Sequence, residues 1–402
     1  MTLMGPLDGV VVIELCHVMA GPTCGLMLAD MGADVIKVEK LDGDDTRHTL
    51  PPDINGESAA FLMMNRNKRG IVVDLKTEDG KRVLKKLLET ADVVTENYRP
   101  DTMQKLGLDY EDLRKSNPGL IYGAISGFGR TGPYALRGGF DLVAQGYSGL
   151  MSITGEGPER PPVKVGAPVA DITAGILLAM GILAAYVRRL KTGEGQMVDT
   201  SLLEAGIVHT YWQSAISFAT GEPPRAMGSA HPLNAPYQAI RSQDGYFNLG
   251  AANPRTWKLM VEAIGRPELA EDPRFADNEG RMANRDELIA ELESVFTTRT
   301  SAEWLEILEA ARVPAGPILD VQEMHENEQV LARDMVQELD HPVAGRVQTL
   351  GPPVKFGTTP GGVHRPAPGF GQHTREVLLE YGFAAAEIEA LAASGAIVLG
   401  DA

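Results

Sequence analysis

Asp171 is the residue whose type and position could best perform chemistry. It lies between Gly166 and Gly175, directly before a long apolar run from Ile172 to Val187. A carboxylate at the start of an apolar helix can cap that helix by accepting hydrogen bonds from free backbone N–H groups. The same N–H groups could keep the carboxylate ionised, so that it acts as a nucleophile. The segment alone favours the cap.

Basic residues form a second candidate feature. They gather in loop-like places: Lys37 and Lys40, Lys68 and Arg69, Lys76, Arg99 and Lys105. The first three groups lie at or beside the ends of predicted strands, where α/β sheets bind ligands. Scattered Lys and Arg usually mark a solvated surface, so a phosphate-rich ligand is the less common of the two interpretations.

The segment Gly127–Gly132 matches G-x-G-x-x-G and follows a predicted strand. A dinucleotide fingerprint should open a helix, but Pro133 and the run Arg137–Gly139 predict a loop instead. The eight histidines are scattered and show no H-x-x-x-H pattern, so no metal site is predicted. Cys16 and Cys24 are expected to pack as small hydrophobic residues.

Composition excludes several classes of protein. The net charge of −17 argues against nonspecific binding to nucleic acid or to an anionic membrane surface. The 402 residues and the 44% hydrophobic content predict a folded protein of two or three domains. No secretory signal is recognised and only two cysteines occur, which predicts a reduced, cytoplasmic protein.

The first half of the chain alternates short apolar runs with helical stretches. This alternation is typical of βαβ units and a mostly parallel sheet. The strands are expected at Val10–Leu15, Val35–Val38, Ile71–Val73, Val93–Val94 and Leu120–Ile125, with helices at Pro22–Met31 and Glu78–Glu89.

A smaller α+β domain is expected after a linker at Gly221–Pro224. Asp244–Gly245 predicts a hairpin between strands at 237–240 and 246–249. Helices are expected there at Thr256–Ile264, Arg285–Phe296 and Ser301–Ala311, and in the tail at Thr374–Tyr381 and Ala384–Ala393. The Pro/Gly-rich run from Gly351 to Gly371 should travel over another surface. The predicted division is a large domain over 1–220, the small domain over 221–325, and a C-terminal segment over 326–402 that returns to the large domain.

Several blocks, in order along nearly the whole chain, resemble family III CoA transferases, a group that includes formyl-CoA transferase, carnitine CoA-transferase and α-methylacyl-CoA racemase. The blocks are Leu7–Val10 with Ala20–Pro22, Gly32–Glu39, Asn65–Arg69 with Asp74–Lys76, Glu96–Pro100, the Asp171 segment with Lys191–Gln196, and Val313–Pro317. The resemblance implies a Rossmann-like large domain, a smaller domain and a homodimer of two interlocked rings, in which the segment from Gly351 helps to close the ring.

The resemblance also implies a mechanism. An Asp at the position of Asp171 attacks the thioester of an acyl-CoA, giving a mixed anhydride and then an aspartyl-CoA thioester. An acceptor carboxylate reverses these steps. Asp141 falls where formyl-CoA transferases carry an acidic catalytic residue. No permanently bound cofactor is implied, because CoA is part of the substrate.

By the same resemblance, Val18, Met19 and Ala20 would lie near the thioester. The nucleotide and its phosphates would contact Lys40, Val73, Lys76, Lys105 and Leu106, and Arg99 is added for its charge and proximity. Formyl-CoA transferase has Gln where this chain has Met19, and its glycine-rich active-site loop has no counterpart here, the nearest candidate being Asn248–Asn253. Oxalate is therefore not the expected acceptor.

The racemase branch uses a His-Asp pair for proton exchange, and here the pair aligns with Phe140 and Asp141. Because Phe cannot take a proton, a transferase is favoured over a racemase. A CoA-binding protein without catalysis and a nucleotide-dependent oxidoreductase remain alternatives. The expected partners are an acyl-CoA, a small carboxylic acid such as succinate or another dicarboxylate, and a second copy of the chain. Arg47 and Arg137 are candidates to bind the acceptor's carboxylate.

Overall fold

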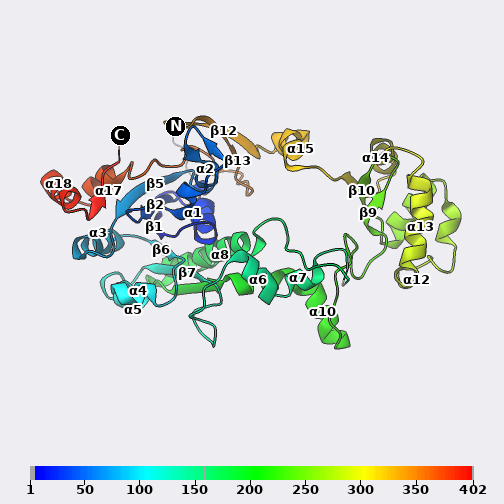
Figure 1. The fold of residues 1–402 in the computed structure, drawn as a ribbon, viewed down its shortest axis with the longest axis horizontal. Coiled ribbons are helices and arrows are strands. Elements are labelled where there is room, and N and C mark those ends of the chain that lie inside the picture. The colour runs from blue at the N-terminus through cyan, green and yellow to red at the C-terminus, as the bar shows by residue number, and fades with distance from the viewer. Residues whose placement is uncertain (1–4, 158, 401–402) are drawn as a thin grey trace. The chain divides into compact units, whose positions relative to one another are not determined.

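The computed structural model describes residues 5–157 and 159–400, which form two compact units (Figure 1). The first unit contains the chain up to Leu150, then Val165–His209, and the chain from Glu328 onward. The second contains Met151–Lys164 and Thr210–Asn327. These units differ from the predicted division in three segments, because 151–164, 210–220 and 326–327 lie with the second unit. Whether either unit folds as an independent domain stays a prediction.

A seven-stranded sheet organises the first unit, in the order β14-β5-β2-β1-β6-β7-β8. Its strands are β1 (Val11–Leu15), β2 (Asp34–Glu39), β5 (Lys68–Val73), β6 (Val93–Glu96), β7 (Ile121–Ser126), β8 (Met197–Ser201) and β14 (Ile397–Val398). All pairings are parallel except that of β14 with β5. The predicted parallel sheet is therefore confirmed. Every residue of β5, β6 and β7 is buried, as expected for a sheet covered on both faces.

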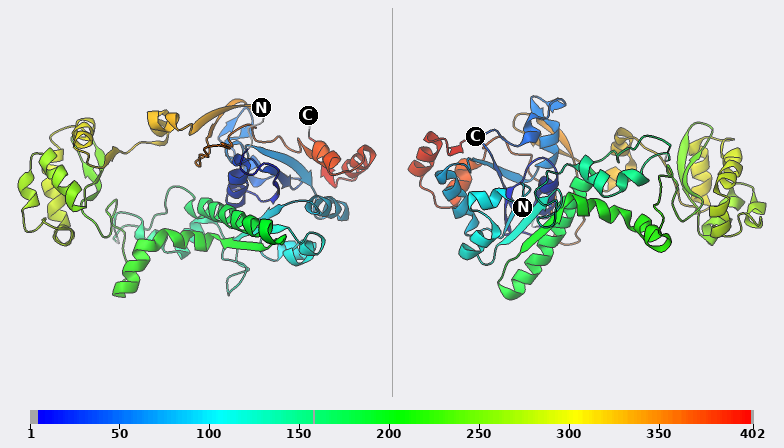
Figure 2. Two further views of the ribbon diagram at one scale, coloured as in Figure 1. Left: turned by 180° about the vertical axis from the view of Figure 1, so that it is seen from behind. Right: turned by 60° about the horizontal axis from the view of Figure 1, so that its bottom comes forward.

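The side chains of successive residues of β1 point to opposite faces of this sheet. Val12 packs with α1 (Ala20–Asp30) and α8 (Val169–Thr192), and Figure 2 shows α8 running along the sheet. Ile13 packs with α3 (Glu78–Leu88), α17 (Thr374–Glu380) and α18 (Ala385–Ala393) on the other face. Because side chains alternate along a strand, α1 and α8 cover one face of the sheet and α3, α17 and α18 cover the other. Helix α8, which carries Asp171, therefore lies on the same face as α1, the helix that follows the turn after β1.

The two helices of that layer approach closely at Gly175. A Cβ there would lie 2.5 Å from the carbonyl oxygen of Ala20 and 2.6 Å from the Cβ of Thr23. Gly175 is one turn after Asp171, so the two residues share a face of α8. The missing side chain therefore allows Asp171 to approach the start of α1.

The rest of the first unit surrounds this core. It contains η1 (Asp45–His48), β3 (Asp53–Ile54), β4 (Glu57–Ser58), α2 (Ala59–Met64), α4 (Thr102–Leu106), α5 (Tyr110–Ser116), α6 (Asp141–Tyr147), α9 (Leu202–Ile207), α16 (Glu328–Ala332) and the hairpin of β12 (Val336–His341) with β13 (Gly345–Leu350). The run from Gly351 to Gly371 has no helix or strand and lies on this unit, where Arg365 and Pro368 offer carbonyls to Asn67 and Arg47. The prediction for this run is confirmed.

The second unit contains a three-stranded antiparallel sheet of β9 (Tyr237–Arg241), β10 (Tyr246–Gly250) and β11 (Ala315–Pro317). Its helices include α10 (Tyr211–Thr220), α11 (Pro254–Ala263), α12 (Asn278–Ala283), α13 (Arg285–Phe296), α14 (Ser301–Ala310) and α15 (Val321–Glu326). Phe247, Trp257 and Phe296 lie in its core. The predicted hairpin is confirmed, and α13 has the predicted bounds.

Helix α8 is long and apolar enough to cross a membrane by length and composition alone, and 39% of its most apolar window is buried. It extends beyond the apolar run from Ile172 to Val187 at both ends. Its buried residues face the sheet, as a core helix requires.

Candidate active site

A cavity of about 400 Å³ opens in the first unit at the carboxyl ends of β1, β6 and β7. The chain leaves β1 toward β2 on one side of the sheet and later returns to β6 on the other side. The cavity therefore lies at the point where the strand order reverses, which is where open α/β sheets bind ligands. Its lining includes His17–Ala20 after β1, Asn97–Pro100 after β6, Ser126 and Gly127 after β7, Arg137–Phe140, and Asp171.

Asp171 lies inside the first turn of α8, because the helix begins at Val169 and Pro168 stands at the cap position. No side chain caps the helix from Pro168. In the described chain, Asp171 also receives no side-chain hydrogen bond from the helix N–H groups. The expectation that Asp171 caps α8 is wrong, because it lies within the helix and the N–H of Ala170 already donates to another carboxylate.

That carboxylate belongs to Asp141, the first residue of α6. Its Oδ1 accepts a hydrogen bond from the N–H of Ala170 at 2.9 Å, and its Oδ2 accepts one from the side-chain amide of Gln145 at 2.7 Å. The buried Gln145 in turn accepts a hydrogen bond from the N–H of Val165 at 2.9 Å. Asp141 therefore caps α8 from a neighbouring helix and does not line the cavity.

The environment of Asp171 raises the pKa of its carboxyl to about 6, first by burial and second by the negative charge of Asp141. At neutral pH the carboxylate is therefore mostly ionised but poorly solvated. A carboxylate in this state is more nucleophilic than one in water, because less solvent must be displaced when it attacks.

The structure brings some predicted site residues together and leaves others outside the cavity. Val18, Met19, Ala20 and Arg99 line the same cavity as Asp171. The cavity lining does not include Lys40, Val73, Lys76, Lys105 or Leu106. Lys40 and Lys105 are exposed and form ion pairs with Asp45 and Asp101, whereas Val73 is 1% exposed within the sheet core. Nucleotide contacts at these five positions stay predictions.

Three of the basic residues at the strand ends are buried, which corrects their assignment as a possible phosphate site. Lys37 and Lys68 have no exposed side-chain surface and pair with Glu14, and Arg69 is 6% exposed and pairs with Asp34. Lys37 and Lys68 are part of the protein core, and the guanidinium of Arg69 is already occupied by Asp34, Glu376 and Glu380.

The two arginines considered for the acceptor's carboxylate have different environments. Arg47 forms two hydrogen bonds of 2.7 Å with the buried Glu39 and stacks on Phe61. Arg137 lines the cavity, stacks over Tyr134 at 3.8 Å and donates to the hydroxyl of Tyr147 at 3.2 Å. Of these two arginines, only Arg137 lines the cavity that contains Asp171.

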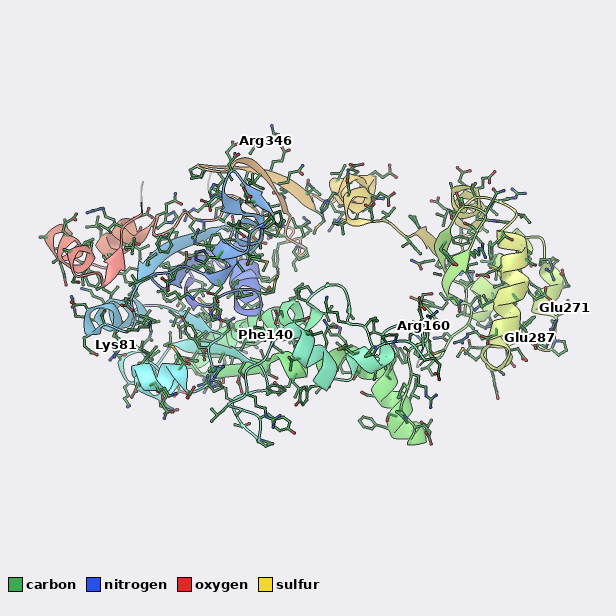
Figure 3. The ribbon with its side chains drawn as sticks, in the orientation of Figure 1. Lys81, Phe140, Arg160, Glu271, Glu287 and Arg346 are labelled. Carbon is green, nitrogen blue, oxygen red and sulfur yellow. The ribbon has the colours of Figure 1, made fainter. Side chains whose placement is uncertain are left out.

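The loop Gly127–Gly132 does not open a helix, as predicted, and begins beside the cavity. Arg130 holds it in place by donating to Glu96 at 2.7 Å and to the carbonyl of Pro100 at 2.9 Å. Burial raises the pKa of Glu96 to about 7 although Arg130, Tyr98 and Tyr122 favour its ionised form. Figure 3 labels Phe140, which is exposed at the start of α6 and lines the cavity.

Asn97 is a cavity residue that the sequence did not single out. Its side chain accepts a hydrogen bond from the N–H of His17 at 3.0 Å and donates one to the carbonyl of His17 at 2.8 Å. It thereby joins the segment after β6 to the turn after β1. The available signal was its position three residues after the predicted strand Val93–Val94; the observed strand β6 extends to Glu96, so Asn97 follows it directly. Over residues 5–157 and 159–400, no cluster of His, Cys, Asp or Glu could hold a metal ion.

Comparison with known proteins agrees with this geometry. The model of CoA-transferase family III matches residues 7–374. The chain is 41% identical to a succinate–glutarate CoA-transferase of Agrobacterium fabrum, covering 93% of this chain and 95% of that protein. It is 40% identical to an acetyl-CoA:oxalate CoA-transferase of Acetobacter aceti, covering 88% of this chain and 89% of that protein.

Solved structures show the same fold. A CaiB/BaiF family protein from Brucella suis superposes with a TM-score of 0.82 at 41% identity, covering 94% of this chain and all of that one. Rv3272 from Mycobacterium tuberculosis gives a TM-score of 0.82 at 32% identity, covering 93% of this chain and 99% of that one. The resemblance noted in the sequence is confirmed, and the chain is an enzyme that belongs to CoA-transferase family III.

Proposed function

We propose that this enzyme moves CoA from an acyl-CoA to a small carboxylic acid through a covalent intermediate on Asp171. The observation that carries the proposal is the position of Asp171. Among the residues that line the cavity in the described chain, it is the only carboxylate, and the cavity lies where the sheet binds ligands. Family membership supports acyl-CoA and carboxylate substrates.

The proposed reaction is a relay of four displacements. An oxygen of Asp171 attacks the thioester carbonyl and the C–S bond breaks. The products are CoA thiolate and a mixed anhydride between Asp171 and the donor acid. The thiolate attacks the carbonyl carbon of Asp171, releasing the donor acid and forming an aspartyl-CoA thioester. The acceptor carboxylate attacks that thioester and forms a second anhydride. The thiolate then attacks the acceptor's carbonyl, which gives the new acyl-CoA and frees Asp171.

A carboxylate nucleophile suits this relay better than a hydroxyl group. An acyl anhydride is reactive enough to regenerate a thioester, so each step is close to balanced. An ester on serine would be too stable for this. The raised pKa of Asp171 supports the role, because burial that raises the pKa to about 6 also removes water that would hydrolyse an anhydride.

Asp141 acts in this proposal as a positioning residue. Its hydrogen bond to the N–H of Ala170 fixes the first turn of α8, where Asp171 lies. Its charge also contributes to the raised pKa of Asp171. It does not touch the cavity, so we assign it no step in acyl transfer.

We further propose that the acceptor is a dicarboxylate, whose second carboxylate binds Arg137. Relatives named for succinate, glutarate and mesaconate support this class. Arg137 supports it because this residue lines the cavity of Asp171 and its guanidinium contacts Tyr134 and Tyr147. A guanidinium recognises a carboxylate through two parallel N–H donors.

CoA is expected to enter past Val18, Met19, Ala20 and Arg99. Its nucleotide would extend toward the exposed Lys40, Lys76 and Lys105 on the same unit. A homodimer of interlocked rings and a cytoplasmic location are the remaining parts of the proposal. The dimer rests on the family resemblance, and the location rests on the low cysteine content.

Trapping the intermediate tests the proposed function. Incubation with succinyl-CoA and then hydroxylamine should leave a hydroxamate on Asp171, located by peptide mass analysis. Asp171→Asn keeps the size of the side chain and should abolish both the hydroxamate and acyl exchange. Asp199→Asn is the control, because Asp199 is also an acid of raised pKa, but it is exposed on β8 and lies outside the cavity. Deuterium uptake at the α-carbon without acyl exchange would support a racemase instead.

Arg137 is tested by comparing acceptors. Arg137→Leu should raise the KM for glutarate by about 10- to 100-fold, the loss expected for one charged hydrogen-bonded contact. The KM for butyrate, which has no second carboxylate, should change little. Arg137→Lys keeps the charge and should lose less than Arg137→Leu. Equal losses for both acids would assign Arg137 to another task.

A further inference from the structure

The turn after β1 contains a strained backbone conformation at the cavity. Val18 has a φ of +66°, in the left-handed region. Among the described non-glycine residues with positive φ, it is the one with a β-branched side chain. Such a side chain disfavours this region strongly, so the surrounding structure must hold the turn. Packing cannot do so, because Val18 is 39% exposed.

Polar groups hold the main chain of this turn. The N–H of Val18 donates to Oδ1 of Asp44 at 3.2 Å. The carbonyl of Cys16 accepts a hydrogen bond from Nζ of Lys37 at 2.8 Å. The main chain of His17 is bonded on both sides by Asn97. Three successive residues before Met19 are thus each tied to a different side chain.

Asp44 and Lys37 are tied to each other beneath the turn. Nζ of Lys37 lies 2.7 Å from Oδ2 of Asp44, and their side chains are 0% and 1% exposed. Oδ1 of Asp44 also accepts hydrogen bonds from the N–H and the hydroxyl of Thr46 at 2.9 and 2.7 Å. Asp44 therefore cannot move without breaking several short contacts.

The pair belongs to a balanced buried network. Glu14 lies 3.4 Å from Lys37 and 2.9 Å from Lys68, and all three side chains are fully buried. Glu14, Asp44, Lys37 and Lys68 thus carry two negative and two positive charges. Buried ion pairs add little net stability compared with apolar residues of the same size, so such a network is better explained by the geometry that it imposes.

We infer that Asp44, anchored by Lys37, is a positioning residue that holds Val18 in its left-handed conformation and thereby sets the Val18–Ala20 part of the lining of the cavity that contains Asp171. The inference deepens the proposed function, because Val18–Ala20 would then position the thioester of the acyl-CoA. Neither Asp44 nor Lys37 lines the cavity, so they act only through the turn.

Two uncharged double variants isolate the hydrogen bond to Val18. Lys37→Met with Asp44→Asn keeps an oxygen acceptor, and Lys37→Met with Asp44→Leu removes it at similar volume. Glu14 and Lys68 still neutralise each other in both. The Leu variant should show a kcat/KM at least about tenfold below that of the Asn variant, since small misplacement of reacting groups costs this much or more.

Adding Val18→Gly separates positioning from a structural role. Glycine adopts the left-handed conformation without strain, so the turn needs less support. Val18→Gly should recover most of the activity lost in the Leu variant and none in the Asn variant. Equal activity of the two double variants, or no recovery with glycine, would overturn the inference.

Hydrogen exchange on the unaltered protein decides the question if the double variants do not fold. The N–H of Val18 lies in a partly exposed turn and has Asp44 as its acceptor. It should exchange at least about a hundredfold more slowly than an unstructured peptide, because it opens only with the buried network. Exchange at the peptide rate would overturn the inference. This measurement needs no transferase activity, so failure of the proposed function remains a separate result.

Discussion

Asp171 is subject to effects that oppose one another. Burial and the charge of Asp141 raise the pKa of its carboxyl to about 6. The N-terminal turn of α8 favours the ionised form, since the helix dipole is positive there. The result is a carboxylate that is ionised at neutral pH, although its ionisation costs free energy in this environment. A nucleophile needs this combination, and a residue that only stabilised the fold would not.

The first prediction at the residue scale concerns pH. Attack requires the ionised form, so the single-turnover rate of acylation should fall by about tenfold per pH unit below pH 6 and level off above pH 7. Stopped-flow measurement of CoA release between pH 4.5 and 8 checks this. A rate that is flat down to pH 4.5 would contradict an ionising group with this pKa.

The second prediction concerns stability. The pKa of Asp171 in the folded state lies above the usual 3.8, so folding favours binding of a proton to this carboxylate. The contribution of Asp171 to the free energy of unfolding is therefore fully present below about pH 4 and is lost as the pH rises from about 4 to about 6. Asp171→Asn removes this cost. At pH 7.5 it should stabilise the protein by roughly 1–3 kcal/mol, the lower values allowing for partial exposure. At pH 4.5 the gain should be much smaller.

Thermal unfolding at the two pH values, with Asp199→Asn for comparison, measures this difference. A destabilising Asp171→Asn at pH 7.5 would show that the carboxylate has a structural role. Loss of activity together with a gain in stability is the outcome expected of a catalytic group held in an unfavourable site.

At the scale of elements, the position of Asp171 depends on how closely α8 approaches α1. Gly175 permits this approach, because any Cβ there would overlap the main chain of Ala20. Asp141 fixes the start of the same helix from α6. Two neighbouring helices therefore determine where one carboxylate lies, although none of the contacts involves the carboxylate itself.

The third prediction is that Gly175→Ala moves α8 and lowers both stability and activity. Alanine favours a helix over glycine by about 1 kcal/mol, but overlap with main-chain atoms should outweigh this and destabilise by about 1–3 kcal/mol. Gly181→Ala in the same helix is the control, because its Cβ would lie 2.6 Å from a methyl group of Val198 and near no main-chain atom of another element, so that only a side chain must shift. Denaturant unfolding and kcat/KM for both variants provide the test. Equal effects would argue against a special contact at Gly175.

Much of this element arrangement was predictable. The apolar runs of β1, β2, β5 and β7 indicate the parallel sheet of the first unit. The Asp244–Gly245 step predicts the hairpin of β9 and β10 in the second unit. The two-residue strand β14 was not predicted, because it depends on pairing with β5 rather than on its own pattern. The burial of Lys37 and Lys68 was also missed, because lysine is usually exposed and its pairing with Glu14 joins residues far apart in the chain.

The candidate site was predictable only where a single residue stood out in the sequence. Asp171 could be singled out because it is an isolated acid in an apolar segment. The cap formed by Asp141 could not be seen, because it joins Asp141 of α6 to Ala170 of α8, which are 29 residues apart in the chain. The sequence pattern records which residues are present, whereas hydrogen bonds between elements depend on how those elements pack.

At the scale of the whole molecule, α8 also has an apolar face turned away from the sheet. Ile176, Met180, Val187 and Leu190 are each about half exposed or more and recur at the spacing of one helix face. A soluble protein seldom leaves such a stripe in water. The stripe supports the proposed homodimer, in which a second copy would cover it.

The fourth prediction follows from this stripe. Met180→Asp should weaken self-association, because an unpaired charge would be buried in the contact. Light scattering over a range of protein concentrations should find a dimer for the unaltered chain and an increased monomer fraction for Met180→Asp. Arg188→Asp, on the polar part of the same helix, is the control. A monomeric unaltered chain would exclude the proposed dimer.

The relay through Asp171 is tested most directly by following oxygen. The acceptor carboxylate contributes the bridging oxygen of the second anhydride, and that oxygen stays on Asp171 when the new thioester forms. With an ¹⁸O-labelled dicarboxylate acceptor, one turnover should add one ¹⁸O to the peptide containing Asp171. Acyl exchange that leaves this peptide unlabelled would contradict the account.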